Sequence, residues 1–107
     1  MNGHTLIPNL PDLIESIQPD SIISRTFYKD DQVTAVLFAF DAGQELSEHT
    51  ASQSAIIHIL RGEATITLGD ETHEVGPDAW LHMPPRETHS VSARTPLIML
   101  LLLLKQV

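Results

Sequence analysis

Two histidines, His49 and His89, lie near turn-forming residues in a chain that has no cysteine. A turn glycine, Gly43, precedes His49, and a strand is expected to begin at His49 and run to a second turn at Gly62. If that segment is one unbroken strand, every second residue lies on the same face, because side chains alternate along a strand. That face would then carry His49, Ala51, Gln53, Ala55 and Ile57. One imidazole, one amide and several small or apolar side chains on a common face predict the wall of a pocket.

Imidazole is a common ligand for zinc, iron, manganese and nickel, so a divalent metal is one candidate cofactor. A catalytic ion usually takes three or more protein ligands, and His49 and His89 alone would make a weak site. Gln53 could add an amide oxygen. His82, seven residues before His89, could point into the same cavity or to the outer face. Arg25, inside a predicted strand, could pair with an anionic ligand in the pocket or lie in solvent.

The elements that must position these residues are short strands separated by closely spaced turn signals. They are predicted at residues 22–28, 33–40, 49–61, 64–68, 72–75, 79–83 and 97–104. No long helical period is visible, which predicts an all-β barrel of antiparallel strands. Residues 1–20 contain three prolines and predict a short helix or an extended arm, with the barrel at residues 21–107. The chain of 107 residues is long enough for a single domain.

The segment 97–104 consists of eight consecutive apolar residues. A membrane-spanning helix needs about 20, so this segment is expected to be a strand that is apolar on both faces. The barrel core would cover one face, and a second subunit is the expected cover for the other, which predicts a homodimer. Trp80 is expected in the core, and His73, beside a turn, is expected in solvent.

The charge balance limits the classes of partner. The chain has 14 acidic and 6 basic residues, with a formal net charge of −8. No basic run is present to neutralise phosphates, so neither nucleic acid nor an anionic membrane surface is expected as a partner. The first residues lack the charged flank and apolar core of a signal peptide, which predicts a cytoplasmic protein.

Two motifs give the sequence a family resemblance. The spacing of Gly43, His49, residues 51 and 55, and Gly62 resembles the first motif of the cupins, and Pro84 to His89 resembles the second. The resemblance extends from about residue 25 to residue 104. It implies a small single-domain cupin of the RmlC-like type, whose fold is an antiparallel double-stranded β-helix, or jelly roll.

The chain departs from the cupin pattern at four positions. Cupin metal sites typically supply three histidines and one glutamate, but positions 51 and 55 are both alanine here. The resemblance therefore implies a degenerate metal site that keeps His49 and His89. Arg86 and Asp78 replace two glycines of the second motif.

Three functions are compatible with these residues. The first is a barrel that binds a small molecule in a cavity lined by Ala51 and Ala55. The second is a metal-dependent enzyme, of the dioxygenase or isomerase type, that uses His49 and His89 with Gln53 or His82. The third is a structural module whose apolar strands only form a dimer.

Overall fold

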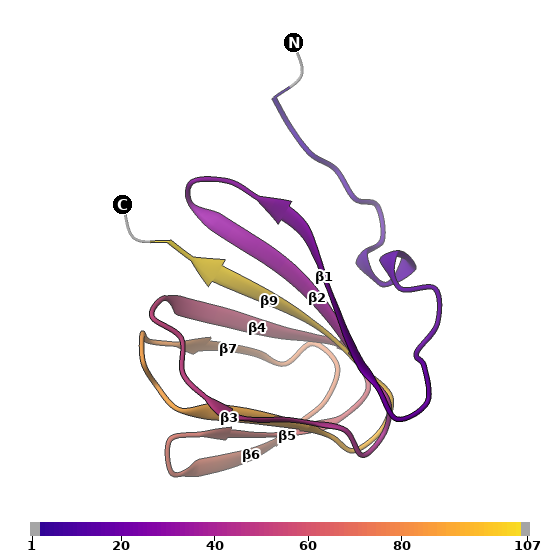
Figure 1. Cartoon of the computed structure of the whole chain (residues 1–107), viewed down its shortest axis with the longest axis vertical. Coiled ribbons are helices and arrows are strands. Elements are labelled where there is room, and N and C mark those ends of the chain that lie inside the picture. The colour runs from indigo at the N-terminus through magenta and orange to yellow at the C-terminus, as the bar shows by residue number, and fades with distance from the viewer. Residues whose placement is uncertain (1–2, 106–107) are drawn as a thin grey trace.

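The computed structural model describes residues 3–105, which form two antiparallel β-sheets that face each other (Figure 1). The strands are β1 (Ile22–Lys29), β2 (Val33–Phe40), β3 (Glu45–His49), β4 (Ser54–Arg61), β5 (Ala64–Leu68), β6 (Glu71–Val75), β7 (Trp80–Met83), β8 (His89–Ala93) and β9 (Leu97–Leu104). One sheet has the order β1-β2-β9-β4-β7, and the other has the order β3-β8-β5-β6. The predicted all-β antiparallel fold is confirmed.

The segment 49–61 is not one unbroken strand, so the prediction of a continuous face from His49 to Ile57 is wrong. Strand β3 ends at His49 in the four-stranded sheet, and β4 begins at Ser54 in the five-stranded sheet. Residues 50–53 cross from one sheet to the other, which requires a loop. The parity of side chains along a strand is therefore lost between His49 and Ala55.

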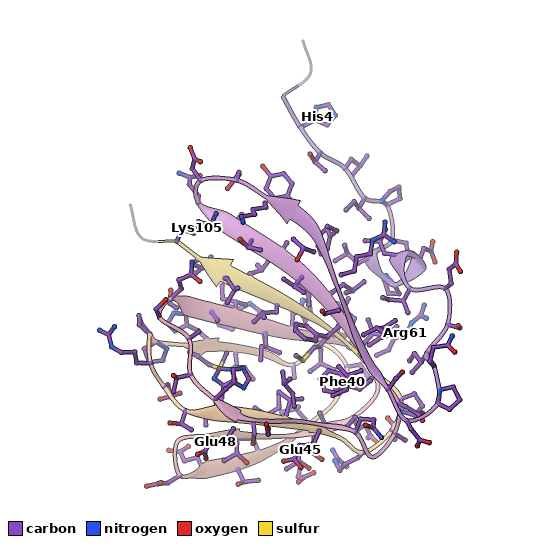
Figure 2. The ribbon with its side chains drawn as sticks, in the orientation of Figure 1. His4, Phe40, Glu45, Glu48, Arg61 and Lys105 are labelled. Carbon is purple, nitrogen blue, oxygen red and sulfur yellow. The ribbon has the colours of Figure 1, made fainter. Side chains whose placement is uncertain are left out.

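The core lies between the two sheets and is built from cross-strand pairs. Phe40 pairs with Leu97, and Ile57 pairs with Leu101. Eleven buried residues form this cluster, and they come from both sheets. In Figure 2 the ring of Phe40 lies between the sheets where they converge. Burial of these apolar side chains supplies the main force that holds the sheets together.

The outer face of the five-stranded sheet is partly covered by the segment before β1. A short 3₁₀ helix, η1 (Leu10–Leu13), and the residues after it pack on this face. Leu37, Ala39 and Ile98 are buried beneath it. Arg25 lies on the same face, and its Nη1 donates a hydrogen bond to the Leu13 carbonyl oxygen at 3.1 Å. Among residues 3–105, no helix is long and apolar enough to cross a membrane.

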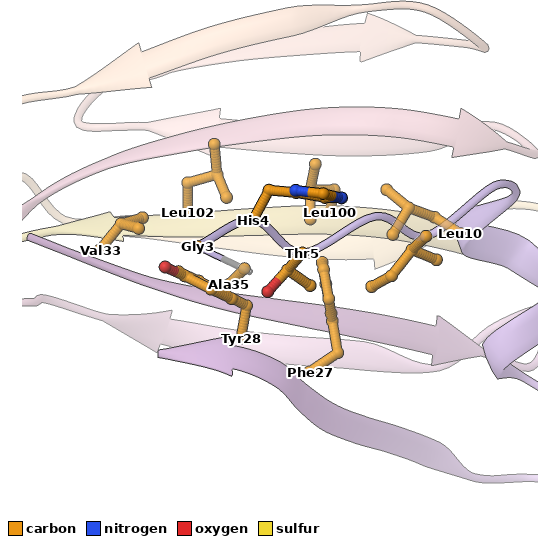
Figure 3. A pocket seen from close by; sticks show the side chains of 11 residues that line it. Gly3, His4, Thr5, Leu10, Phe27, Tyr28, Val33, Ala35, Leu100 and Leu102 are labelled. Carbon is orange, nitrogen blue, oxygen red and sulfur yellow. The ribbon is translucent and has the colours of Figure 1, made fainter. Parts of the chain in front are cut away.

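A cavity lies outside the barrel, beneath the start of the chain. It has a volume of about 560 Å³ and separates residues 3–10 from the outer face of β2 and β9 (Figure 3). Tyr28 lines it, and its hydroxyl donates to Asp30 Oδ2 at 2.7 Å. This hydrogen bond raises the pKa of Tyr28 and lowers that of Asp30.

The two ends of the barrel interior differ. We call one the closed end, where Phe40, Ile59, Ala64, Ala93 and Leu97 are all at most 1% exposed. The turn at Gly62, with φ +86°, joins β4 to β5 there. We call the other the histidine end, where β3 and β7 finish and β4 and β8 begin.

Candidate functional site

His49 and His89 meet at the histidine end. They are cross-strand partners in the ladder between β3 and β8, and their ring centroids lie 4.1 Å apart with the planes tilted by 60°. His89 is buried, with 6% of its surface exposed, whereas His49 is exposed. The register of one sheet therefore places two imidazoles together at the mouth of the interior.

Both rings are oriented by backbone carbonyls. Nδ1 of His49 lies 2.8 Å from the Ser47 carbonyl oxygen, and Nδ1 of His89 lies 3.2 Å from the Glu87 carbonyl oxygen. A carbonyl can only accept, so Nδ1 is the protonated nitrogen of each ring. In the neutral ring the lone pair then lies on Nε2. Each Nε2 can accept a hydrogen bond from a ligand or coordinate an ion.

The environment of His89 favours its neutral form. Burial lowers the pKa of His89, and the nearby His49 lowers it further. The hydrogen bond to the Glu87 carbonyl and the Glu87 carboxylate oppose this shift but do not reverse it. Removal from water disfavours the charged ring, which explains the direction. The neutral His89 ring is therefore suited to accept a hydrogen bond from a donor group of a ligand.

The four other residues predicted for the pocket wall divide between loop and strand. Ala55 and Ile57 lie on the inner face of β4, at 2% and 1% exposure, opposite Met83 and Leu81 of β7. Ala51 and Gln53 are half-buried in the loop 50–53.

Two predicted pocket residues lie elsewhere. His82 is exposed and pairs with Ile56, so it lies on the outer face, because Met83 on the inner face has the opposite parity. Arg25 is exposed on the outer face of β1, where it bonds to the Leu13 carbonyl. Of the two alternatives left open for each residue, the structure shows the outer face for His82 and Arg25, so neither belongs to the pocket.

The donor set does not fit a resident catalytic metal. Within residues 3–105, no three His, Cys, Asp or Glu side chains lie close enough to hold one ion. Position 55, where the cupin pattern has a glutamate, is a buried alanine between Met83 and Leu103. Two imidazoles fall short of the three or more protein ligands that a catalytic ion usually takes.

The two replaced glycines keep a glycine-like backbone. Asp78 has φ 73° and Arg86 has φ 66°, in the left-handed region that non-glycine residues rarely adopt. The Arg86 N–H donates to the Ala51 carbonyl oxygen at 2.7 Å. This bond ties the loop before His89 to the loop after His49. The strain at Arg86 is therefore held beside the paired imidazoles.

Strand β8 carries His89 but was not predicted as a strand. Its sequence alternates, with His89, Val91 and Ala93 on the buried face and Ser90 and Ser92 between them. This period of two was a usable signal.

Trp80 was also misplaced. It is 61% exposed rather than part of the core, because Leu81 occupies the inward position.

The fold agrees with that of known proteins. The cupin domain family profile matches residues 36–103, so the chain belongs to the cupin family. A conserved protein of unknown function from Streptococcus pyogenes has a similar structure, with 29% identity, a TM-score of 0.85, and coverage of 99% of this chain and 92% of that one. A cupin superfamily protein from Desulfitobacterium hafniense shares 27% identity at a TM-score of 0.85, covering 99% and 95%.

An enzyme has the same fold at greater distance. The DMSP lyase DddQ from Ruegeria pomeroyi shares 20% identity at a TM-score of 0.74, covering 80% of this chain and 48% of that one. This likeness concerns the fold alone. Among curated protein sequences, none matches this chain.

Proposed function

We propose that this cupin binds a small molecule at the histidine end of its barrel, with His49 and His89 in direct contact with the ligand. The observation that carries the proposal is the pair of imidazoles 4.1 Å apart, each held through Nδ1 by a backbone carbonyl. Such preorganised polar groups beside an apolar interior are typical of ligand sites. Ala51 and Ala55 are smaller than the donors that the cupin pattern has at these positions.

A metal-dependent enzyme is the second candidate. The same two Nε2 atoms favour it, because both can coordinate a divalent ion such as zinc, iron, manganese or nickel. Gln53, half-buried in the adjoining loop, would have to supply a further ligand. The fold is compatible with catalysis, since a DMSP lyase shares it. This candidate ranks second because two imidazoles are fewer than the three protein ligands that a catalytic ion usually takes.

Elemental analysis tests the choice between the two. The protein should be purified without chelators and without a nickel affinity column. We expect far less than one equivalent of metal. One equivalent that is lost in both His49→Ala and His89→Ala would instead support the enzyme. One equivalent that both variants retain would show that neither histidine is a ligand.

A thermal-shift screen against small molecules tests binding itself. A compound that stabilises the native protein should lose its effect in His49→Ala and in His89→Ala. It should keep its effect in His82→Ala, which removes an imidazole from the outer face. If no stabilising compound depends on the two histidines, the proposed site is wrong.

We also propose that the protein is a cytoplasmic homodimer. Leu100, Leu102 and Leu104 lie on the outer face of β9 and are only half-buried. A second subunit on that face would remove them from water. Sedimentation equilibrium at micromolar concentration should show twice the 11.8 kDa mass of the chain. A sedimentation profile that shows only monomer would contradict the dimer. It would also contradict the hypothesis that the chain is a purely structural dimer module.

A further inference from the structure

A groove opens on the side of the barrel where the two sheets have unpaired edges. Strand β6 ends the four-stranded sheet and β7 ends the five-stranded sheet. Between them is a groove of about 460 Å³, whose lining includes Leu68, Val75, Ala79, Leu81, His73 and Trp80. This volume lies within the range of small-molecule sites, about 300–1,000 Å³.

The strand register links this groove to the histidine pair. His49 pairs with His89, His89 pairs with Leu68, and Leu68 pairs with Glu71. These four residues form one row across the four-stranded sheet. Leu68 lines the groove and packs against the core, so it lies between the two. With about 4.8 Å between neighbouring strands, Glu71 is about 10 Å from His89.

A hydrogen-bond acceptor, Glu71, lies next to a residue that lines the groove, and an exposed aromatic residue lines the groove itself. The Glu71 carboxylate accepts from Nε2 of His73 at 3.3 Å when that ring is protonated, and its side chain is 78% exposed. A second carboxylate at the groove, Glu74, is already engaged by Arg94 at 2.7 Å. Trp80, which is 61% exposed, lines the groove from the edge strand of the other sheet. Glu71 contacts a histidine rather than an arginine and is the more exposed of the two, so it is the carboxylate that a ligand can engage.

We propose that the small molecule is a flat aromatic compound, about 10 Å long, with a hydrogen-bond donor at each end. One donor reaches the imidazoles of His49 and His89, and the other reaches the Glu71 carboxylate. The ring lies over Leu68 and against Trp80. This inference rests on the proposed function, because one end of the ligand is assigned to the histidine pair.

Charge selects between otherwise similar ligands. The chain carries a formal charge of −8, Glu74 lines the groove, and Glu71 contacts His73, which also lines it. A cationic or neutral donor is favoured there, whereas an anionic end would be repelled. Two probes with the same phenol ring separate these cases. Tyramine ends in an ammonium, and 4-hydroxyphenylacetate ends in a carboxylate.

Fluorescence titration provides the test, because Trp80 is the only tryptophan in the sequence. Tyramine should change the Trp80 emission saturably, and 4-hydroxyphenylacetate should bind at least tenfold more weakly, which corresponds to about 1.4 kcal/mol. Glu71→Gln should lower the affinity for tyramine about tenfold, as expected for loss of a charge-assisted bond. Glu45→Gln makes the same change in charge on the outer face, where Glu45 pairs with Ser92, and should bind tyramine normally.

The outcomes separate the groove from the histidine site. Suppose that calorimetry detects tyramine binding that requires His89, while Trp80 emission does not change and Glu71→Gln binds tyramine as tightly as the native protein. This result would show that the ligand does not occupy the groove, and the proposed function would stand. A Trp80 response that is unaffected by His89→Ala would overturn the two-ended ligand and count against the proposed function. Failure of tyramine to bind at millimolar concentration, with Glu71→Gln and native protein alike, would overturn the inference.

Discussion

The closed end and the histidine end are made from the same strands but are built for different purposes. At the closed end, five apolar residues from both sheets are at most 1% exposed. At the histidine end, Leu68 and Leu103 are only half-buried, and two imidazoles replace hydrocarbon. Close packing at one end supplies stability, so the other end can carry polar groups that packing alone would disfavour. Stability and binding can therefore be altered separately in this protein.

The largest expected effect is at the closed end. Gly62 has φ +86°, and an added Cβ would collide with the Pro96 carbonyl oxygen. We expect Gly62→Ala to lower the free energy of unfolding by about 3 kcal/mol or more, since left-handed strain and overpacking add. Gly69→Ala is the control, because φ is +58° there but no atom lies within 4 Å of the new Cβ. Urea denaturation that finds equal losses in both variants would contradict tight packing at Gly62.

The next effect concerns metal affinity at the histidine end. Ala55→Glu with Ala51→His places donors at both replaced positions of the cupin pattern. We expect zinc affinity to rise more than about tenfold, or about 1.4 kcal/mol, if each new donor reaches the ion. Because Ala55 faces the interior and Ala51 lies in a loop, Ala55→Glu alone should supply most of the gain. Calorimetric titration of the folded double variant with zinc measures this change. A zinc affinity equal to that of the native protein would show that side chains at these positions do not reach the histidines.

A smaller effect is expected from relieving backbone strain near the histidines. Arg86 has φ 66°, which costs a non-glycine residue about 1–2 kcal/mol. Arg86→Gly removes this cost but adds flexibility to the unfolded chain, so we expect a net gain of about 0.5–1 kcal/mol. Asp78→Gly should gain less, because aspartate tolerates this conformation better. The midpoints of urea unfolding measure both, and a destabilised Arg86→Gly variant would show that the arginine side chain stabilises the loops.

The smallest effect is a pH dependence that arises at the histidine end and not at the closed end. The pKa of His89 is lowered in the folded state. Below the ordinary histidine pKa of about 6.5, the unfolded chain therefore binds more protons than the folded chain does. Stability from the neutral ring is complete above that value and is lost as the pH falls toward the folded pKa. His89→Gln should be less sensitive to pH in this window. Equal slopes of unfolding free energy against pH in the two proteins would contradict a buried neutral His89.

The sequence predicted most of the strands but fewer of the site's contacts. Strands β2, β5 and β9 begin and end where polar turns and prolines bound apolar runs. The loop 50–53 contains neither glycine nor proline, so nothing marked the break between β3 and β4. The family motifs predicted that His49 and His89 belong together, and the structure brings their rings into contact.

The remaining errors concern residues whose surroundings come from distant parts of the chain. Strand β7 has apolar residues of both parities, Trp80 and Leu81, so the sequence did not decide which faced inward, or where His82 pointed. The partner of Arg25, the Leu13 carbonyl, depends on how residues 3–20 fold back over the sheet. The domain boundaries at residues 1–20 and 21–107 and the cytoplasmic location remain predictions.

The central position of β9 has a consequence for how the protein is made. This strand lies between β2 and β4 and hydrogen-bonds to both, yet it is synthesised after every other strand. Without β9, the pair of β1 and β2 and the pair of β4 and β7 would each have an open edge. Such edges can pair with other chains, and the long loops to be closed slow folding. Chains in which β9 has not yet joined the sheet are therefore expected to aggregate more readily than the complete fold.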